Sequence, residues 1–271
     1  MSIVFVGGGN MASALIGGLI GCGWKAAQLF VVEIAADARR ALEQRYGVGV
    51  GSDLPARIAA DATVLLAVKP QQMRQVAEAL RAALTGQLVV TIAAGIRTAD
   101  LSRWLDGHAR IVRVMPNTPA LVQAGVSALY AMPGADREDR GRAEAILAAV
   151  GPTLWVQREE LMDAVTAVSG SGPAYVFYFM EALIDAAHEL GLDAAAARLL
   201  ALETFHGAAA LARQSADPPS ALRARVTSKG GTTEAALCAF DEQSVRERIV
   251  AAVKQAAARS RELGEELGRA E

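Results

Sequence analysis

A buried strand and a helix meet in the stretch Ile3-Val4-Phe5-Val6-Gly7-Gly8-Gly9-Asn10-Met11-Ala12. The four apolar residues predict a strand, and the spacing of Leu15, Leu19 and Ile20 predicts the helix that follows. Between them the glycines fit the pattern G-x-G-x-x-A, in which the first glycine makes a tight turn and the second lets a pyrophosphate approach the backbone. A small third residue lets helix and strand pack closely. The stretch therefore predicts a dinucleotide-binding βαβ unit.

The first half of the chain continues as an alternation of short apolar runs and helical patterns. Such alternation is typical of parallel, doubly wound sheets of the Rossmann type. The expected strands cover residues 30–32, 64–68, 88–92, 111–114, 126–130 and 154–156, and the expected helices cover residues 37–46, 72–84, 99–104 and 142–150. We therefore expect an α/β domain over residues 1–158.

The second half of the chain reads as helices only. These are expected at residues 174–190, 194–213, 219–226, 234–240 and 244–267, so residues 159–271 are predicted to form an all-α domain. In the first of these helices the apolar residues cover more than one face. Such a helix needs burial on several sides, as in the core of a dimer. The apolar residues concerned are Val176, Phe177, Met180, Leu183 and Ile184.

The composition is that of an ordinary globular protein without a basic surface. Of the 271 residues, 52% are hydrophobic and 21% are charged, and the net charge of −2 argues against nucleic-acid binding. Cys22 and Cys238 give neither a disulfide framework nor the spacing of a zinc site. Glycines interrupt the apolar N-terminal stretch, unlike in a signal peptide, and no apolar run is long enough to cross a bilayer. The sequence thus predicts a cytoplasmic protein.

Glu33 ends the second expected strand, where a carboxylate can accept hydrogen bonds from the adenosine ribose hydroxyls. The same carboxylate repels a 2′-phosphate and so favours NADH over NADPH. Arg39 and Arg40 follow on the next expected helix and could reach a phosphate, but a solvated helix face is the favoured interpretation of the pair.

Three further loops follow buried strands, at the ends of the runs 64–68, 88–92 and 111–114. Ligands of such sheets bind at the carboxyl ends of the strands, so these loops are expected to border the dinucleotide. With the glycine stretch and the acid of the second strand, the expected cofactor-binding residues are Gly7, Gly8, Gly9, Asn10, Met11, Ala12, Glu33, Ala67, Val68, Lys69, Pro70, Ala93, Ala94, Gly95, Pro116 and Asn117.

A second motif of glycines and hydroxyls lies in Thr227-Ser228-Lys229-Gly230-Gly231-Thr232-Thr233, ahead of a helix expected to begin at Glu234. Free N–H groups and the positive dipole end of a helix start favour a carboxylate or a phosphate. The stretch predicts an anion-binding loop that could hold a substrate acid, with plain helix capping as the structural alternative. The expected substrate-binding residues are Ser228, Gly230, Gly231, Thr232 and Thr233.

A third motif, Thr166-Ala167-Val168-Ser169-Gly170-Ser171-Gly172-Pro173-Ala174-Tyr175, leads into the long expected helix, with Ser171 as a possible cap. Together with the 227–233 loop it resembles the pyrroline-5-carboxylate reductase family. The resemblance runs the length of the chain, and its further motifs are Gly8–Ala12, Val68-Lys69-Pro70, Met115–Pro119 and the run from Pro219 to Asp241.

The resemblance implies an enzyme of the last step of proline synthesis, which reduces the ring C=N of 1-pyrroline-5-carboxylate to L-proline with a nicotinamide cofactor. It implies a homodimer formed through the helical domain, with dimers assembled into a decamer. It also implies that Ser228 and the N–H groups of Thr232 and Thr233 hold the substrate carboxylate. By the same resemblance the Thr233 hydroxyl is expected near the ring nitrogen and Thr166 close by, which makes Thr233 and Thr166 the expected catalytic residues. NADPH is the cofactor that the family implies, whereas Glu33 in this chain indicates use of NADH.

Other classes of protein fit the residues less well. Another two-domain NAD(P)-dependent imine or β-hydroxyacid dehydrogenase shares the architecture, but β-hydroxyacid dehydrogenases carry a catalytic lysine on the long helix, and residues 174–190 contain none. A non-catalytic dinucleotide-binding regulator would not need the hydroxyl-rich loop. Glu181, Asp185 and His188 share one helix face, but a polar stripe explains them better than a metal site, and no metal is expected.

Overall fold

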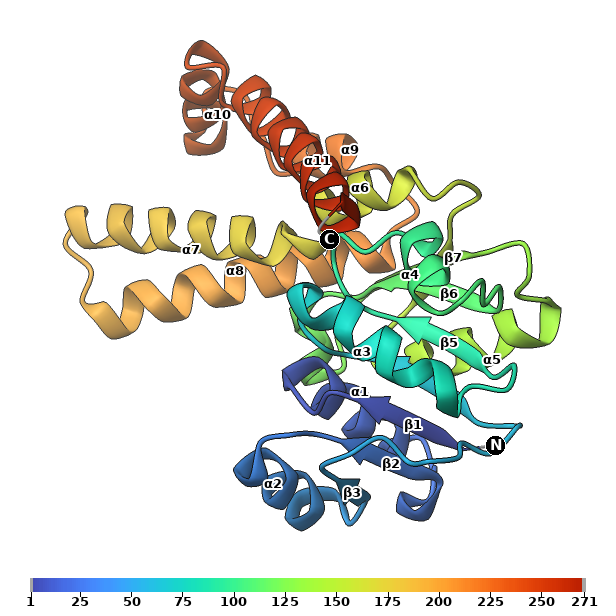
Figure 1. The fold of residues 1–271 in the computed structure, drawn as a ribbon. Helices are drawn as coiled ribbons and strands as arrows, with labels where there is room; N and C mark the ends of the chain where they lie inside the picture. The colour runs from blue at the N-terminus through green and yellow to red at the C-terminus, as the bar shows by residue number, and fades with distance from the viewer. Residues whose placement is uncertain (1, 270–271) are drawn as a thin grey trace. The chain divides into compact units, whose positions relative to one another are not determined.

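The structure, a computed structural model, describes residues 2–269 and contains one eight-stranded sheet (Figure 1). The strand order is β3-β2-β1-β4-β5-β6-β7-β8. All neighbours pair in parallel except β6 and β7, which are antiparallel. The strands are β1 (Ile3–Val6), β2 (Leu29–Val32), β3 (Gly49–Gly51), β4 (Thr63–Leu66), β5 (Leu88–Thr91), β6 (Ile111–Met115), β7 (Ser127–Ala131) and β8 (Thr153–Trp155).

Helices cover both faces of this sheet because successive strand residues point to opposite faces. Ile3 and Phe5 of β1 belong to a cluster with α1, α2 and α5, whereas Val4 and Val6 belong to a cluster with α3 and α4. These helices are α1 (Asn10–Gly21), α2 (Ala36–Tyr46), α3 (Met73–Leu80), α4 (Thr98–Trp104) and α5 (Arg137–Ala148), and short 3₁₀ turns lie at Ala26–Gln28, Pro70–Gln72, Arg81–Ala83 and Thr118–Val122. The doubly wound α/β architecture expected from the sequence is confirmed.

The structure adds details that the sequence patterns do not indicate. The short strand β3 contains two glycines and only one apolar side chain, so it has no readable apolar run. Helix α5 begins earlier than residue 142, because Asp136 caps it by accepting a hydrogen bond of 2.9 Å from the Asp139 N–H. A short helix, α6 (Leu161–Val165), runs directly into one π-helical turn, Thr166–Gly170.

The contacts of the chain define two compact units. The sheet unit comprises the chain up to Ser171 and from Gln255 onward, and the helical unit comprises Gly172–Lys254. This division lies beyond residues 158–159, where the sequence suggests a domain boundary, because α6 packs against β7. The last part of α11 (Val245–Arg269) likewise returns to the sheet unit.

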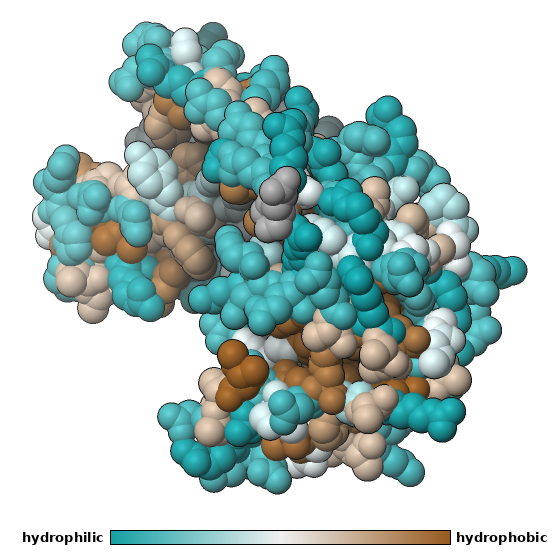
Figure 2. Space-filling model, viewed as in Figure 1, coloured by the Kyte–Doolittle hydropathy of each residue, from teal (hydrophilic) through white to brown (hydrophobic). Residues whose placement is uncertain are grey.

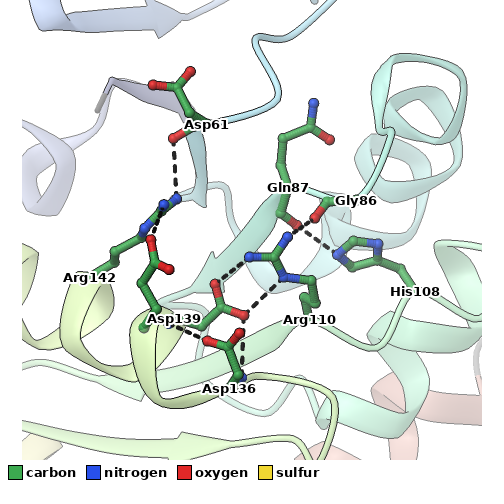
Figure 3. A network of polar contacts seen from close by, with 9 residues as sticks. Asp61, Gly86, Gln87, His108, Arg110, Asp136, Asp139 and Arg142 are labelled. Atoms are coloured by element: carbon green, nitrogen blue, oxygen red, sulfur yellow. Dashed lines mark hydrogen bonds and ion pairs between the residues drawn. The ribbon is translucent and has the colours of Figure 1, made fainter.

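A network of charged side chains joins β6 to the start of α5 at the amino-terminal edge of the strands (Figure 3). Arg110, directly before β6, donates from Nη2 and Nε to the two carboxylate oxygens of Asp139, at 2.7 and 2.9 Å. The Asp139 side chain is completely buried, while that of Arg110 is 38% exposed. His108 lies beside them, with Nε2 donating to the Gln87 carbonyl at 2.9 Å, and burial lowers its pKa. The ring is therefore neutral at pH 7.

The helical unit consists of α7 (Gly172–Glu189), α8 (Ala194–Gln214), α9 (Pro219–Arg225), α10 (Thr232–Glu242) and the first part of α11. Helices α7 and α8 pack against each other, yet none of the residues of α7, all of them described, is fully buried. Phe177 is 58% exposed and Leu199 60% exposed. Figure 2 shows hydrophobic residues among hydrophilic ones on these two helices. So much apolar surface on a helix pair indicates a protein partner.

Candidate active site

Gly7 forms the turn between β1 and α1 with a φ of +100°, which glycine adopts without the penalty that other residues incur. Its N–H donates to the Val32 carbonyl at 2.8 Å. A Cβ built on Gly7 would lie 2.7 Å from the carbonyl oxygen of Ala67, so the backbones of two loops touch here. A side chain at this position would push the loop after β1 away from the loop after β4.

The start of α1 offers an open anion site. A Cβ built on Gly9 would meet no described atom within 4 Å, and none of the described side chains caps the helix. Ala12 is completely buried against the sheet, so the helix start lies close to β1. Uncapped N–H groups and the dipole of a helix of 12 residues favour a pyrophosphate. The shape and polarity of the loop thus fit a dinucleotide.

Glu33 links the glycine stretch to the loop after β2. Its Oε2 accepts a hydrogen bond of 2.8 Å from the Gly8 N–H, and its Oε1 accepts one of 2.8 Å from the Ala35 N–H. Each carboxylate oxygen keeps a lone pair, so ribose hydroxyls can still donate to it. The sequence signal for an acid at the end of the strand locates Glu33 but not its contact with Gly8, which lies 25 residues away.

Arg39 and Arg40 differ in their surroundings. The Nη1 of Arg39 donates to the carbonyl oxygens of Glu33 and Ile34, at 2.6 and 2.8 Å, so its guanidinium lies on the loop after β2. Arg40 forms an exposed ion pair with Asp37 and is a solvated helix residue. The interpretation as a solvated helix face therefore holds for Arg40 and is wrong for Arg39.

The other expected cofactor loops follow β4, β5 and β6, which are neighbours of β1 in the sheet. Because β1, β4, β5 and β6 are parallel, their carboxyl ends lie at one edge. Lys69 is exposed there, whereas Gly95 and Pro116 are buried. Asn117 uses its Oδ1 to accept a hydrogen bond of 2.9 Å from the Val126 N–H. The structure thus brings all the expected cofactor residues to this edge, with Asn117 also bracing the start of β7.

Thr166 opens the π-helical turn, and this turn packs on the end of β6. The Ser171 N–H donates to the Thr166 carbonyl at 2.8 Å, and the Thr166 hydroxyl donates to the Met162 carbonyl at 2.7 Å. A Cβ built on Gly170 would clash with the terminal methyl group of Met115. Ser171 continues the helical backbone rather than capping α7, because it has helical dihedral angles. Thr166 therefore lies near the carboxyl end of β6, a proximity that the sequence does not reveal.

In the helical unit the loop of residues 227–233 leads into α10. Gly230 turns the chain with a φ of +74°, and the Gly231 N–H donates to the Ser228 carbonyl at 3.0 Å. Helix α10 begins at Thr232, two residues before the expected start, and no described side chain caps it. The N–H groups of Thr232 and Thr233 therefore point out of the helix start and are open to an acceptor. The Ser228 hydroxyl lies beside them, 2.5 Å from where a Gly231 Cβ would stand.

Glu234 lies in the first turn of α10, directly after this loop, and is not among the substrate-binding residues expected from the sequence. Its Oε2 accepts a hydrogen bond of 2.6 Å from the Gly230 N–H. That N–H is consequently engaged within the loop, which leaves Gly230 with the role of shaping the turn. The available signal was an acid three residues after the helix N-cap, as in a capping box.

No group of three or more His, Cys, Asp or Glu side chains within residues 2–269 is arranged to hold a metal ion. This covers Glu181, Asp185 and His188, so the polar stripe on α7 has no metal-site geometry. Across the same described residues, no helix combines the length and apolar character needed to cross a membrane.

A glycine turn before an uncapped helix, at the carboxyl edge of a doubly wound sheet, is the geometry of a dinucleotide-binding protein, here with a second, helical unit. The chain is 45% identical to the pyrroline-5-carboxylate reductase of Pseudomonas aeruginosa, an alignment that covers 98% of each protein. It belongs to the pyrroline-5-carboxylate reductase family.

Solved structures and family descriptions agree with this assignment. The pyrroline-5-carboxylate reductase of Coxiella burnetii has a TM-score of 0.90 and 40% identity, with 97% of this chain and 98% of that one covered. The pyrroline carboxylate reductase of Plasmodium falciparum, solved with NADP bound, has a TM-score of 0.86 and 28% identity over the same shares. Residues 2–95 match the family described as NADP oxidoreductase coenzyme F420-dependent, and residues 159–263 match Pyrroline-5-carboxylate reductase dimerisation.

The chain is accordingly an NAD(P)H-dependent oxidoreductase of proline biosynthesis. Its cofactor is a nicotinamide dinucleotide, and its helical domain forms a homo-oligomer. Homo-oligomer formation accounts for the exposed apolar residues of α7 and α8, since a dimer would cover them.

Proposed function

We propose that the chain transfers hydride to the C=N carbon of 1-pyrroline-5-carboxylate, giving L-proline, with the substrate carboxylate held at the start of α10. The open N–H groups of Thr232 and Thr233 carry this proposal. Two N–H donors and the neighbouring Ser228 hydroxyl match the two oxygens of a carboxylate. Glu234 stabilises the loop conformation through Gly230.

The chemistry asks the protein for orientation more than for a strong acid. When bound, NAD(P)H supplies the hydride. A protonated C=N is already electrophilic, so fixing the ring against the donor provides much of the rate enhancement. We assign the Thr233 hydroxyl to the ring nitrogen and give Thr166 a supporting hydrogen-bonding role. In the sheet unit, the residues from Gly7 to Ala12, Glu33 and the loops after β4, β5 and β6 bind the dinucleotide.

Thr233→Val is expected to lower kcat by about 100-fold, because a hydroxyl that contacts the reacting nitrogen acts in the transition state. Thr233→Ser keeps the hydroxyl and is expected to retain most of the activity. Steady-state kinetics with both substrates would measure the two effects. If Thr233→Val raised KM for the imine and left kcat unchanged, Thr233 would only hold the ring, and its assigned role in the chemical step would be wrong.

We further propose that the chain accepts NADH and that Glu33 restrains the use of NADPH. The carboxylate lies on the Gly8 N–H, where a ribose 2′ substituent would approach it. Arg39 has the opposite effect and favours NADPH, since its guanidinium lies on the same loop and could pair with a 2′-phosphate. The P. falciparum relative was solved with NADP bound, so use of the phosphorylated cofactor is the alternative to be tested.

Glu33→Gln is expected to shift the ratio of kcat/KM for NADPH to that for NADH by about tenfold towards NADPH, or ~1.4 kcal/mol. Glutamine keeps one acceptor oxygen and removes the negative charge that repels the phosphate. Arg39→Ala should shift the ratio in the opposite direction. A wild-type enzyme that strongly prefers NADPH, with a ratio unchanged in Glu33→Gln, would show that Glu33 is not the selector.

For the assembly we propose that homodimers formed through the helical domain combine into a decamer, as the family resemblance implies. The exposed apolar residues of α7 and α8 support the dimer.

For the compartment we propose the cytoplasm, which suits the free, exposed Cys22 and Cys238.

A further inference from the structure

The last turns of α11 lie on the loop that follows β5. A Cβ built on Gly95 would lie 3.0 Å from Leu267 Cδ1 and 3.8 Å from the Gly264 backbone nitrogen. A Cβ built on Gly264 would in turn lie 3.5 Å from the Gly95 carbonyl oxygen. The C-terminal helix and this loop, about 170 residues apart in sequence, are therefore in direct contact.

Small residues on one face of α11 allow this approach. Ser260, Gly264 and Gly268 are spaced four residues apart, so they share a face of the helix. Ser260 is buried and donates from its hydroxyl to Asp163 Oδ1 at 2.7 Å. A Cβ on Gly268 would lie 2.5 Å from Asp100 Oδ2. The helix thus contacts α6, the loop after β5 and α4 in three successive turns.

Where α11 passes the loop after β5, its polar contacts are weak. Arg97 Nη2 donates to the Arg261 carbonyl at 3.4 Å and lies 3.8 Å from Glu265, and each of these two side chains is about two-fifths exposed. Exposed ion pairs of this kind contribute little to stability. Close packing, with the Leu267 side chain against the loop, is what determines the distance between α11 and Gly95.

Helix α11 also begins in a different compact unit from the one in which it ends. Its residues up to Lys254 belong to the helical unit, which carries the 227–233 loop, and those from Gln255 belong to the sheet unit. The helix runs from Val245 to Arg269 as one continuous element. The helix that holds the loop after β5 is thus covalently continuous with the unit proposed to bind the substrate.

We propose that Leu267 and Gly264 are positioning residues for the dinucleotide, which hold the Ala93–Gly95 loop in its binding conformation. The inference rests on the proposed role of this loop in cofactor binding. A loop ordered in advance binds more tightly than one that must be ordered by its ligand, because ordering costs conformational entropy. Leu267 is the side chain that contacts Gly95 from outside the loop, so its truncation should loosen the loop before any other part of the site.

Leu267→Ala is expected to raise the Kd of NADPH, measured by fluorescence titration of the full-length enzyme, roughly fivefold. The KM for NADPH should rise in parallel while kcat stays within about twofold, since the contact does not involve the reacting atoms. Gly264→Ala serves as the second variant. Its Cβ would lie 3.2 Å from Arg97 Nε and 3.5 Å from the Gly95 carbonyl oxygen, so the Arg97 side chain must give by a few tenths of an ångström, and a smaller rise in Kd is expected.

Gly268→Ala is the matched control, because it disturbs the same helix face one turn further on, at Asp100 rather than at the loop. It should lower Tm without changing the Kd of NADPH. If Leu267→Ala and Gly264→Ala also lowered Tm but left Kd and KM at wild-type values, α11 would have a structural role only and the inference would be wrong.

Ala94→Asp tests separately whether the Ala93–Gly95 loop binds the dinucleotide at all. Ala94 is exposed in the middle of the loop, and a carboxylate there should repel the phosphates of a bound dinucleotide. Weaker NADPH binding by Ala94→Asp, together with unchanged binding by Leu267→Ala, would uphold the loop and overturn the role of α11. Unchanged binding of NADPH by Ala94→Asp would show that the loop does not contact the cofactor, and the proposed role of α11 would then be wrong as well.

Discussion

Gly7→Ala is expected to lower kcat/KM about 100-fold, because it shifts the loop that places the dinucleotide by a substantial fraction of an ångström. The new Cβ would stand 2.7 Å from the Ala67 carbonyl oxygen, well inside van der Waals contact. The Ala67 oxygen is a backbone atom and a Cβ is fixed rigidly to its own backbone, so the clash is relieved only by moving the loop after β1 or the loop after β4. Each of these loops is proposed to contact the cofactor. The loss should appear chiefly as a higher Kd and KM for NAD(P)H in titration and steady-state kinetics.

Gly23→Ala is the control for the backbone strain of this substitution. Gly23 has a φ of +93°, close to that of Gly7, but a Cβ built on it would meet no described atom within 4 Å. Its cost should be the conformational penalty alone, about 1–2 kcal/mol of stability, with kcat/KM unchanged. Equal losses of activity in the two variants would show that strain, not the clash with Ala67, accounts for the effect.

Arg110→Ala is expected to lower the free energy of unfolding by about 3 kcal/mol, because it leaves the Asp139 carboxylate buried without its cation. Asp139 is fully buried, which makes the unpaired charge costly (Figure 3). The exposure of Arg110 places the expected value at the lower end of the range for buried pairs. Urea unfolding of the two proteins at pH 7 would measure the difference.

The double variant Arg110→Ala, Asp139→Ala identifies the source of this loss. It removes the unpaired charge, so it should be less destabilised than the sum of the two single variants. The network lies at the amino edge of the strands, opposite the glycine turn, and the folded fraction of Arg110→Ala should keep its kcat/KM. If the double variant lost as much free energy of unfolding as the two single variants lose together, a specific interaction between the two side chains would be contradicted.

Much of the sheet could be predicted because its strands carry local signals. The runs at β1, β4 and β5 are buried on both faces, as parallel strands covered by helices must be, and read as mostly apolar stretches, while the run at β6 is apolar on either side of Arg113. Strand β3 lacked such a run. The early start of α5 depended on one capping aspartate, Asp136, and the π-helical turn at Thr166 left no periodic signal at all.

The candidate site was predictable in its residue types but not in its contacts. The positions of Gly7, Glu33 and Ser228 follow from motifs of adjacent residues, whose spacing is visible in the chain. The hydrogen bond from Gly8 to Glu33, the return of Arg39 to the loop after β2 and the contact of Leu267 with Gly95 join residues that are far apart or on different turns. No local pattern encodes these contacts.

Residue order alone was enough to indicate the tight turn at Gly7, the alternating strands and helices, and the hydroxyl-rich start of α10, because dihedral preference and apolar periodicity act over a few neighbouring residues. Tertiary structure decided that the Glu33 carboxylate accepts a hydrogen bond from the Gly8 N–H, 25 residues away. It also decided that the end of α11 packs on the loop after β5. Both outcomes depend on close packing and on competition for hydrogen-bond partners, which exist only once the chain has folded.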